Sequence, residues 1–201
     1  MSKKRLLMII VWSAALAATG AIADVTHTPL DAAANRGVAA QRDAKETAIR
    51  RLLEQFRTIK IPLSEAVAIA KRLHDGSRTA DVSFEISGPS VYRVRTVKNE
   101  RIWENVIDAN TGSVTEKEIS SSLRELDRED LGNIIALKSV KQELSDAVRI
   151  AEKSAAGSAL AGGLTKQDGK LNFVVVISSD GRLKEVMLEP PRVGKQGATL
   201  H

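Results

Sequence analysis

Cysteine is absent from this sequence of 201 residues, and aromatic side chains are scarce. The absence of cysteine excludes a disulfide bond, a lipid-anchored N-terminal cysteine and a thiolate metal site. With only two Trp, one Tyr and three Phe, the core must consist mainly of Leu, Ile and Val. A chain of this length holds one ordinary domain or two small ones, and a small aliphatic domain is marginally stable alone. We therefore expect two such domains to pack together.

Sequence motifs for catalysis and cofactor binding are also missing. The chain contains no H-E-x-x-H, C-x-x-C, G-x-S-x-G or phosphate-binding glycine loop. Its three histidines, His27, His74 and His201, lie far apart in the sequence. His74 is expected in the last turn of a helix, where a cation suits the helix dipole. We therefore predict a protein that is not an enzyme, with no catalytic residue, no metal site and no other cofactor.

The N-terminal segment has the pattern of a secretory signal peptide. Basic residues at 3–5 precede an uncharged run over 6–23, which ends in an A-x-A cleavage site. The pattern predicts a signal peptide over residues 1–23 that is cleaved between Ala23 and Asp24. The alternative is an uncleaved anchor, because a run of this length approaches the thickness of a bilayer.

Removal of residues 1–23 changes what the charge implies. The whole chain carries a formal net charge of +5, and loss of the three basic residues leaves +2 for the mature protein. A nearly neutral protein gives little electrostatic reason to bind nucleic acid. We expect a periplasmic or secreted protein that meets the membrane only through its signal segment, before cleavage.

An eight-residue pattern occurs twice, 81 residues apart. Six of the eight residues are identical between Leu63–Ala70 and Leu144–Ala151, and at the same offset Ala80 falls on Ala161. This period is too long for a solenoid repeat and suits a small domain with its connector. The sequence therefore predicts a tandem duplication.

Each copy is expected to begin with a helix and to continue with three strands. Ser64 and Ser145 are the expected N-caps, and Gly76 is the expected C-terminal stop of the first helix. Strand-forming segments follow in the first copy over 82–86, 91–98 and 102–107. The apolar stripe of that helix is expected to contain Ala66, Ile69, Ala70 and Leu73, with Ile150 in the place of Ile69 in the second copy.

The second copy has one run of apolar residues that does not alternate. Val174–Ile177 is typical of a central strand that is covered on both faces. Between the copies, Ser122 and Glu125 fit a capping box ahead of a connector helix.

The predicted fold class is α+β, with two tandem units that each pack one helix on a three-stranded antiparallel meander. An N-terminal helix and a connector helix complete it. The expected divisions are a signal peptide over 1–23, a flexible leader over 24–40, an amphipathic helix over 41–60, the first repeat over 61–116, the connector helix over 117–141, the second repeat over 142–190 and a flexible tail over 191–201.

The repeated segment resembles the PepSY domain. The resemblance is carried by L-S-E-A-V-x-I-A-K at 63–71, by Tyr92 and its counterpart Phe173 on a hairpin, and by the closing turn Asp108–Gly112. The second copy departs from the pattern, because Glu189–Arg192 stands where the turn would be. The resemblance implies a helix-plus-sheet fold. PepSY units occur in propeptides of thermolysin-like secreted peptidases and as stand-alone envelope proteins, and they have no catalytic residues to transfer. A secreted metallopeptidase is therefore a candidate partner.

Three residues of the first copy are candidates for partner contact. Arg93 and Arg95 recur on one face of a strand and could meet an acidic partner, although two exposed arginines are ordinary. Trp103 could anchor an interface, or it could pack in the core or at its rim. Its counterpart in the second copy is Lys184.

These observations favour a non-catalytic binding module that restrains or regulates an envelope or secreted peptidase. An exposed strand edge is a plausible contact, unless Pro89 or the neighbouring repeat blocks it. The alternative is a carrier of a small ligand, metal ion or haem in the envelope, which a deep apolar pocket between the repeats would favour. An enzyme would need a constellation of residues that the sequence does not display.

Overall fold

The structure of the protein is a computed structural model that describes residues 29–86, 88–167 and 169–191. Its contacts divide the chain into two units, residues 1–43 and 44–201. The predicted signal peptide with its cleavage site at Ala23 and Asp24, His27, and the end of the tail with His201 lie outside the described residues. No helix in the described part of the chain is long and apolar enough to cross a membrane.

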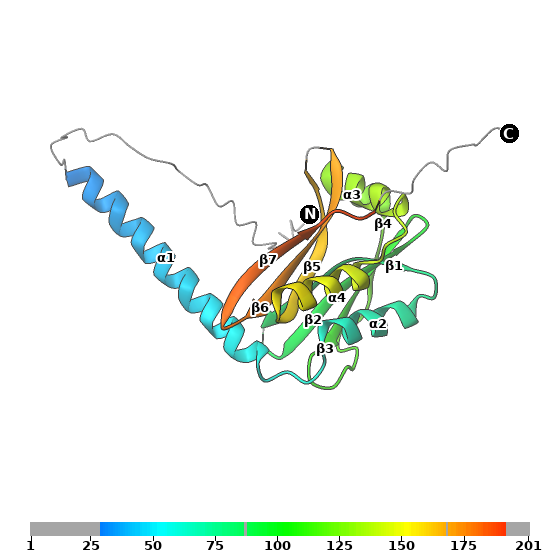
Figure 1. Cartoon of the computed structure of the whole chain (residues 1–201), viewed down its shortest axis with the longest axis horizontal. Coiled ribbons are helices and arrows are strands. Elements are labelled where there is room, and N and C mark those ends of the chain that lie inside the picture. The colour runs from blue at the N-terminus through cyan, green and yellow to red at the C-terminus, as the bar shows by residue number, and fades with distance from the viewer. Residues whose placement is uncertain (1–28, 87, 168, 192–201) are drawn as a thin grey trace. The chain divides into compact units, whose positions relative to one another are not determined.

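The described chain mixes helices with one antiparallel sheet (Figure 1). Its elements in chain order are α1 (Pro29–Phe56), α2 (Leu63–Leu73), β1 (Arg78–Ile86), β2 (Ser90–Lys98), β3 (Arg101–Asp108), β4 (Ile119–Ser122), the 3₁₀ turn η1 (Leu123–Glu125), α3 (Arg128–Lys138), α4 (Leu144–Ala155), β5 (Ser158–Gln167), β6 (Lys170–Ser179) and β7 (Arg182–Leu188).

The first helix, α1, is longer than the amphipathic helix that the sequence predicted over 41–60. It begins at Pro29, inside the segment 24–40 that was expected to be a flexible leader, and it ends at Phe56 rather than at 60. Residues 29–43 of the first unit are helical throughout. This stretch has no apolar periodicity, but it is rich in alanine, the strongest helix former. Within the second unit, the end of α1 buries Leu53 and Phe56.

The sheet has seven strands in the order β4-β3-β2-β1-β5-β6-β7. A helix followed by three antiparallel strands is present in both predicted segments. We call α2 with β1–β3 the first half and α4 with β5–β7 the second half. The two halves are not separate units, because β1 pairs with β5 and makes one continuous sheet. The neighbouring segment thus covers the β1 edge, and Pro89 lies in the β1–β2 turn.

The junction between the halves is narrow. β1 and β5 pair only at Val82 with Gly162 and at Ser83 with Ala161, whereas the hairpins within each half pair over most of their length. We call this junction the seam. Gly162 packs closely under α4 there, since a Cβ atom at this position would lie 3.3 Å from Leu144 Cδ1.

Arg78 ties β1 of the first half to the end of α3, the α3–α4 linker and the N-cap of α4. Its guanidinium donates to the carbonyl oxygens of Leu137, of Val140 at 2.7 Å and of Gln142 at 2.6 Å. Its Nε also bonds Glu143 Oε1 at 2.9 Å. A cation at the C-terminal end of α3 also suits the negative end of the helix dipole.

The strand register corrects the predicted offset along one strand. Arg78 pairs with Val97 in the first half, and Ser158 pairs with Ser178 in the second. The offset is therefore 80 residues along β1 and β5, although it is 81 along β2 and β6. Both first strands contain a bulge one residue after the second paired position. Ala80 consequently corresponds to Leu160 and not to Ala161.

The two sheet-packing helices start earlier than their serines indicated. Their N-caps are Pro62 and Glu143, not Ser64 and Ser145. Glu143 and Asp146 form a capping box. Starting at the leucine puts that side chain on the buried face. The buried residues are Leu63, Ala66, Val67 and Ala70 in α2, and Leu144, Ala147, Val148 and Ala151 in α4.

The predicted apolar stripe was therefore partly wrong. Leu73 is 47% exposed and Ile150 is 41% exposed, whereas Ile69 packs on the core with partial burial. Val67 and Val148, which the predicted stripe omitted, are almost fully buried. The stripe runs along positions i, i+3, i+4 and i+7 from the first leucine of each helix.

The segment between the halves is not one connector helix over 117–141. It contains the strand β4, the turn η1 and the shorter helix α3. The predicted capping box of Ser122 and Glu125 is present, but it caps η1. Asp127 caps α3 by accepting from the Asp130 amide, and Gly132 lies inside the helix without interrupting it.

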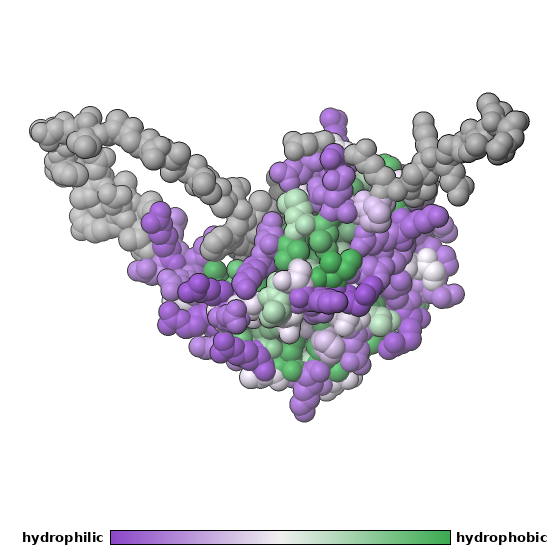
Figure 2. All heavy atoms as spheres, in the orientation of Figure 1, coloured by the Kyte–Doolittle hydropathy of each residue, from purple (hydrophilic) through white to green (hydrophobic). Residues whose placement is uncertain are grey.

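α2 and α4 pack on the sheet, and the strands alternate burial accordingly. In β6 the residues Phe173, Val175 and Ile177 are buried, whereas Val174 and Val176 are only half-buried. The non-alternating run over 174–177 is therefore fully covered on one face only. In the orientation of Figure 1, Figure 2 shows apolar residues at the surface between α3 and α4, with hydrophilic residues around them.

A short aromatic cluster forms the core where α1 meets the first half. The ring centroids of Phe56 and Phe84 lie 5.2 Å apart, and those of Phe84 and Tyr92 lie 5.7 Å apart. The Tyr92 hydroxyl donates to the Ile61 carbonyl at 3.1 Å. Burial raises the pKa of Tyr92, with a smaller contribution from the charge of Glu152.

The turn Asp108–Gly112 closes the first half. Asp108 Oδ1 accepts from the amides of Asn110 and Thr111 at 2.8 Å each, and these bonds lower the pKa of Asp108. The carbonyl of the buried Ala109 accepts from the amides of Lys60 and Ile61, in the linker that precedes α2. Gly112 has φ +73°, which favours glycine, and a Cβ atom there would lie 3.1 Å from Ile69 Cδ1. We call residues 108–112 the closing turn.

Candidate functional site

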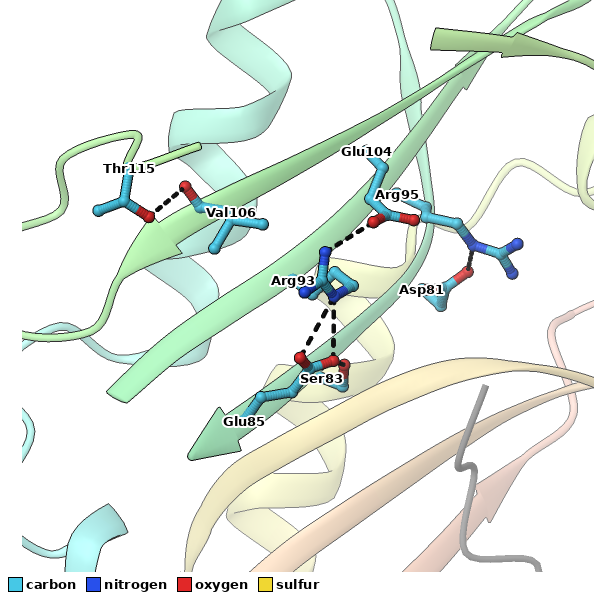
Figure 3. A network of polar contacts seen from close by, with 8 residues as sticks. All are labelled: Asp81, Ser83, Glu85, Arg93, Arg95, Glu104, Val106 and Thr115. Carbon is cyan, nitrogen blue, oxygen red and sulfur yellow. Dashed lines mark hydrogen bonds and ion pairs between the residues drawn. The ribbon is translucent and has the colours of Figure 1, made fainter. Parts of the chain in front are cut away.

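Charged side chains collect on the face of the first half that points away from α2 (Figure 3). Tyr92 and Val94 of β2 are buried beneath α2, so alternation places Arg93 and Arg95 on the opposite face. The strand register puts Asp81 opposite Arg95 on β1 and Glu104 opposite Arg95 on β3. We call this group, together with Glu85 and Asp130, the charged belt.

Arg93 is held between two carboxylates. Its Nε lies 3.2 Å from both oxygens of Glu85, and its Nη1 lies 2.7 Å from Glu104 Oε1. Burial alone would lower the pKa of Arg93, but the hydrogen bonds and charges of Glu85 and Glu104 raise it. The guanidinium of Arg93 is therefore paired with carboxylates of the two neighbouring strands.

Arg95 is more deeply enclosed, with 13% of its side chain exposed. Its Nε lies 2.5 Å from Asp81 Oδ2, and its Nη1 lies 3.1 Å from Asp130 Oδ2 of α3. These two carboxylates raise the pKa of Arg95 against the opposing effect of burial. Burial raises the pKa of Asp81, although the charge and hydrogen bond of Arg95 act in the other direction.

The sequence left open a basic surface around Arg93 and Arg95, but in the structure carboxylates pair with both arginines. The charged belt contains four carboxylates, from Asp81, Glu85, Glu104 and Asp130, against two guanidinium groups. Its formal charge is negative, so it gives no reason to expect an acidic partner. Contact of Arg93 and Arg95 with a partner stays a prediction.

Trp103 lies on the α2 side of β3 and is half-buried. The His74 ring stacks on it, with centroids 4.1 Å apart and planes 14° apart. His74 is the C-cap of α2, and its Nε2 lies 2.5 Å from Glu118 Oε2 just before β4. Trp103 thus packs at the rim of the core, with the His74 ring stacked on it. Its role as an interface anchor stays a prediction.

Two shallow hollows are present in the second unit. One, of about 640 Å³, lies beside the β2–β3 turn and β4 and includes Trp103, Arg101 and Ser121 in its lining. The other, of about 320 Å³, lies between the α1–α2 linker and the second half, with Phe56 and Glu152 in its lining. Both are open with mixed polar and apolar walls, so neither is the deep apolar pocket expected of a ligand carrier. No group of three His, Asp or Glu residues with metal-binding geometry is found in residues 29–86, 88–167 and 169–191.

The two outer strands of the sheet differ in length. β4 is four residues long and covers the outer side of β3. β7 is seven residues long and pairs with β6 on one side, with no strand on its other side in the described chain. β7 therefore presents the longer free edge of backbone donors and acceptors.

Several residues of the site were missed by sequence reasoning. Period-two alternation could have placed Glu85 and Glu104 on the face of Arg93. Asp130 and Glu118 could not have been found that way, because their partners come from a different element and only the tertiary fold brings them together. No sequence pattern around Arg78 predicted its contacts, because its partners lie about sixty residues further along the chain.

A PepSY domain is found over residues 60–118, where the chain matches the family model described as the peptidase propeptide and YPEB domain. This segment contains α2, β1, β2, β3 and the closing turn. A crystal structure of a candidate lipoprotein from Clostridium difficile 630 is similar, with 25% sequence identity, coverage of 66% of this chain and 88% of that chain, and a TM-score of 0.39. None of the curated proteins compared with the chain matches it.

Proposed function

We propose that this protein is an exported, non-catalytic binding module that restrains or regulates an envelope or secreted peptidase through protein–protein contact. The observation that carries the proposal is the PepSY domain over 60–118, whose family description names peptidase propeptides. In this chain the domain has a buried helix face and an ordered closing turn.

The second half is proposed to be a diverged second copy of the same unit. Local hydrogen bonds support this at an offset of 81 residues. Thr58 Oγ1 donates to the Gln55 carbonyl at 2.8 Å, and Ser139 Oγ donates to the Ala136 carbonyl at 2.7 Å. The helix before each half also buries two apolar residues at this offset: Leu53 and Phe56 in α1, Ile134 and Leu137 in α3. An experimental structure with different strand orders in the two halves would contradict the duplication.

Export is proposed through cleavage between Ala23 and Asp24. Intact-mass measurement of the protein from the exported fraction tests this step. We expect a mature chain that begins at Asp24. A mass that retains residues 1–23 would assign the protein to the membrane as an anchored form.

The proposed partner is a secreted metallopeptidase. The experiment titrates the mature protein into metallopeptidases secreted by the same organism and follows cleavage of a fluorogenic peptide. A variant with His27, His74 and His201 replaced by alanine, checked for folding by circular dichroism, is the matched control. Saturable inhibition by both proteins supports the proposal. No inhibition of any secreted or envelope peptidase contradicts it, and saturable uptake of a metal ion or haem that the variant loses would identify a carrier instead.

A further inference from the structure

β3 and β7 occupy the same position in their halves, but only β3 has a strand on its outer side. β4 pairs with β3 at four positions, from Arg101 with Ser122 to Glu104 with Ile119. At the offset of 81, Arg182 and Glu185 of β7 stand in the places of Arg101 and Glu104. The pairing of β4 with β3 shows that the outer side of the third strand of a half can accept an antiparallel strand. Within the described residues the equivalent side of β7 has none.

The side chains of β7 give its edge a definite chemical pattern. The register with β6 places Val186 beside the buried Val175, so Lys184, Val186 and Leu188 lie on the α4 side. Leu183, Glu185 and Met187 lie on the other side. Met187 is 45% exposed. Lys184 Nζ donates to Ser179 Oγ at 2.9 Å and lies 3.7 Å from the exposed Asp180 Oδ2, and its side chain remains 46% exposed to an incoming acceptor.

Charges on an edge strand normally prevent indiscriminate pairing. In β7 they are confined to the first four residues, Arg182 to Glu185, whereas Val186–Leu188 is apolar. An incoming strand must therefore match two adjacent charges of opposite sign, Lys184 and Glu185, and must also supply apolar side chains at one end. This pattern selects a partner sequence.

A second copy of this chain does not match the pattern. A closed two-fold pairing of antiparallel strands places each residue opposite one of the same parity. Centring the pair on Lys184 or on Glu185 opposes two like charges, which is destabilising. Centring it on Leu183 opposes Arg182 to Lys184. Centring it on Val186 opposes both charges to apolar side chains and brings Pro190 against Arg182.

We infer that β7 is a docking edge for an extended segment of a partner protein, which adds to the sheet as an eighth, antiparallel strand. The segment carries apolar residues opposite Val186–Leu188, a basic residue opposite Glu185 and an acidic residue opposite Lys184. Main-chain hydrogen bonds hold the segment, and the side chains set its register. The inference deepens the proposed function, on which it rests for the identity of the partner as a peptidase.

Two peptides of identical composition test the edge without a peptidase. The matched peptide, blocked at both ends, is Val-Ile-Val-Lys-Glu-Ile-Thr, and the control Val-Ile-Val-Glu-Lys-Ile-Thr exchanges its two charged residues. Each is titrated to millimolar concentration into the isotopically labelled full chain, and backbone amide resonances are followed. We expect saturable shifts and slowed amide exchange confined to β7 and β6. The matched peptide should bind about tenfold more tightly, because two cross-strand charge pairs change sign.

The double variant K184E/E185K provides the decisive control, because it should invert the preference between the two peptides. Absence of saturable shifts in β7, equal affinities, or a preference that does not invert would overturn the inference. A concentration-dependent dimer with protected β7 amides would overturn it in favour of a second copy. Peptide binding at β7 without inhibition of any peptidase would refute the proposed function and leave the edge standing. Inhibition that the double variant retains in full, without peptide binding, would do the reverse.

Discussion

The two halves of the sheet share their core and differ at their margins. In both, a helix buries a leucine, two alanines and a valine on three antiparallel strands. After its third strand, the first half adds the closing turn and β4. The third strand of the second half ends at Leu188 and is followed by Glu189, Pro190 and Pro191. The positions that hold helix to sheet are thus the ones that both halves need, and the margins are free to take different roles.

Ile69 and Ile150 show how a margin changes the energy of one residue. Both lie at the same place in their helices. Ile69 is partly buried beside Gly112 of the closing turn, whereas Ile150 is 41% exposed. The identical side chain therefore contributes to the core in the first half and little in the second, because burial of apolar area sets its contribution.

The largest expected effect tests the shared core. Val67→Asp and Val148→Asp should each lower the free energy of unfolding by about 3–5 kcal/mol, since each would bury an unpaired carboxylate. Ile150→Asp should cost no more than about 1 kcal/mol, because its side chain is largely in solvent. Urea denaturation of the three variants measures the differences.

Equal costs for Val148→Asp and Ile150→Asp would break the comparison, because they would show that the second half does not bury its helix as the first does. Ile69→Asp provides the internal reference. It should fall between the two, in line with its partial burial.

A smaller effect is expected at Arg78, which joins the halves. Arg78→Ala should lower the free energy of unfolding by about 2–3 kcal/mol, because Glu143 and three carbonyl groups lose a donor. Arg78→Lys should recover less than half of that loss, since an ammonium group cannot reproduce the planar fork of the guanidinium. Thermal unfolding followed by circular dichroism measures both. Full rescue by lysine would show that charge alone, without geometry, joins the halves.

The smallest effect concerns the closing turn of the first half. The pKa of Asp108 is lowered in the folded protein, so its ionised form stabilises the fold above its unfolded pKa, near 4. That contribution is lost as the pH falls through the folded pKa. Asp108→Ala should therefore lower Tm by about 2 °C at pH 7, and the difference should shrink below about pH 4. Asp108→Asn keeps an acceptor and should lose less, and a difference from wild type that does not vary with pH would contradict the assignment.

Sequence patterns predicted the elements that local chemistry determines. The repeated octapeptide gave both sheet-packing helices, and alternation with turn residues gave the strand order of each half. The capping box at Ser122 was identified, but not the element that it caps, because three residues cannot distinguish a 3₁₀ turn from a helix. The strand β4 was not predicted, because Ile119–Ser122 contains three serines and has no strand-forming pattern of its own. It is a strand because it pairs with the edge of β3.

The candidate site was harder to predict, because its interactions join distant elements. The alternation of Arg93 and Arg95 placed them on one face, but their net effect depends on carboxylates from β1, β3 and α3. The strand register is needed to know which carboxylates lie in the charged belt, and therefore whether its net charge is positive or negative. Likewise, the partial burial of Ile69 depends on its contact with Gly112 of the closing turn and not only on the helix that carries it.

The narrow seam has a consequence for how the chain folds. Within each half every strand pairs with its neighbour in the sequence, so the meanders need only short-range contacts and can form early. The seam instead joins Val82 to Gly162, eighty residues apart in the sequence, by two paired positions. Loop closure over that distance costs on the order of 4 kcal/mol, which two backbone pairs do not repay without the helices and Arg78 around them. We therefore expect two local folding nuclei that join last, with the seam as the first place to open under stress while each meander stays intact.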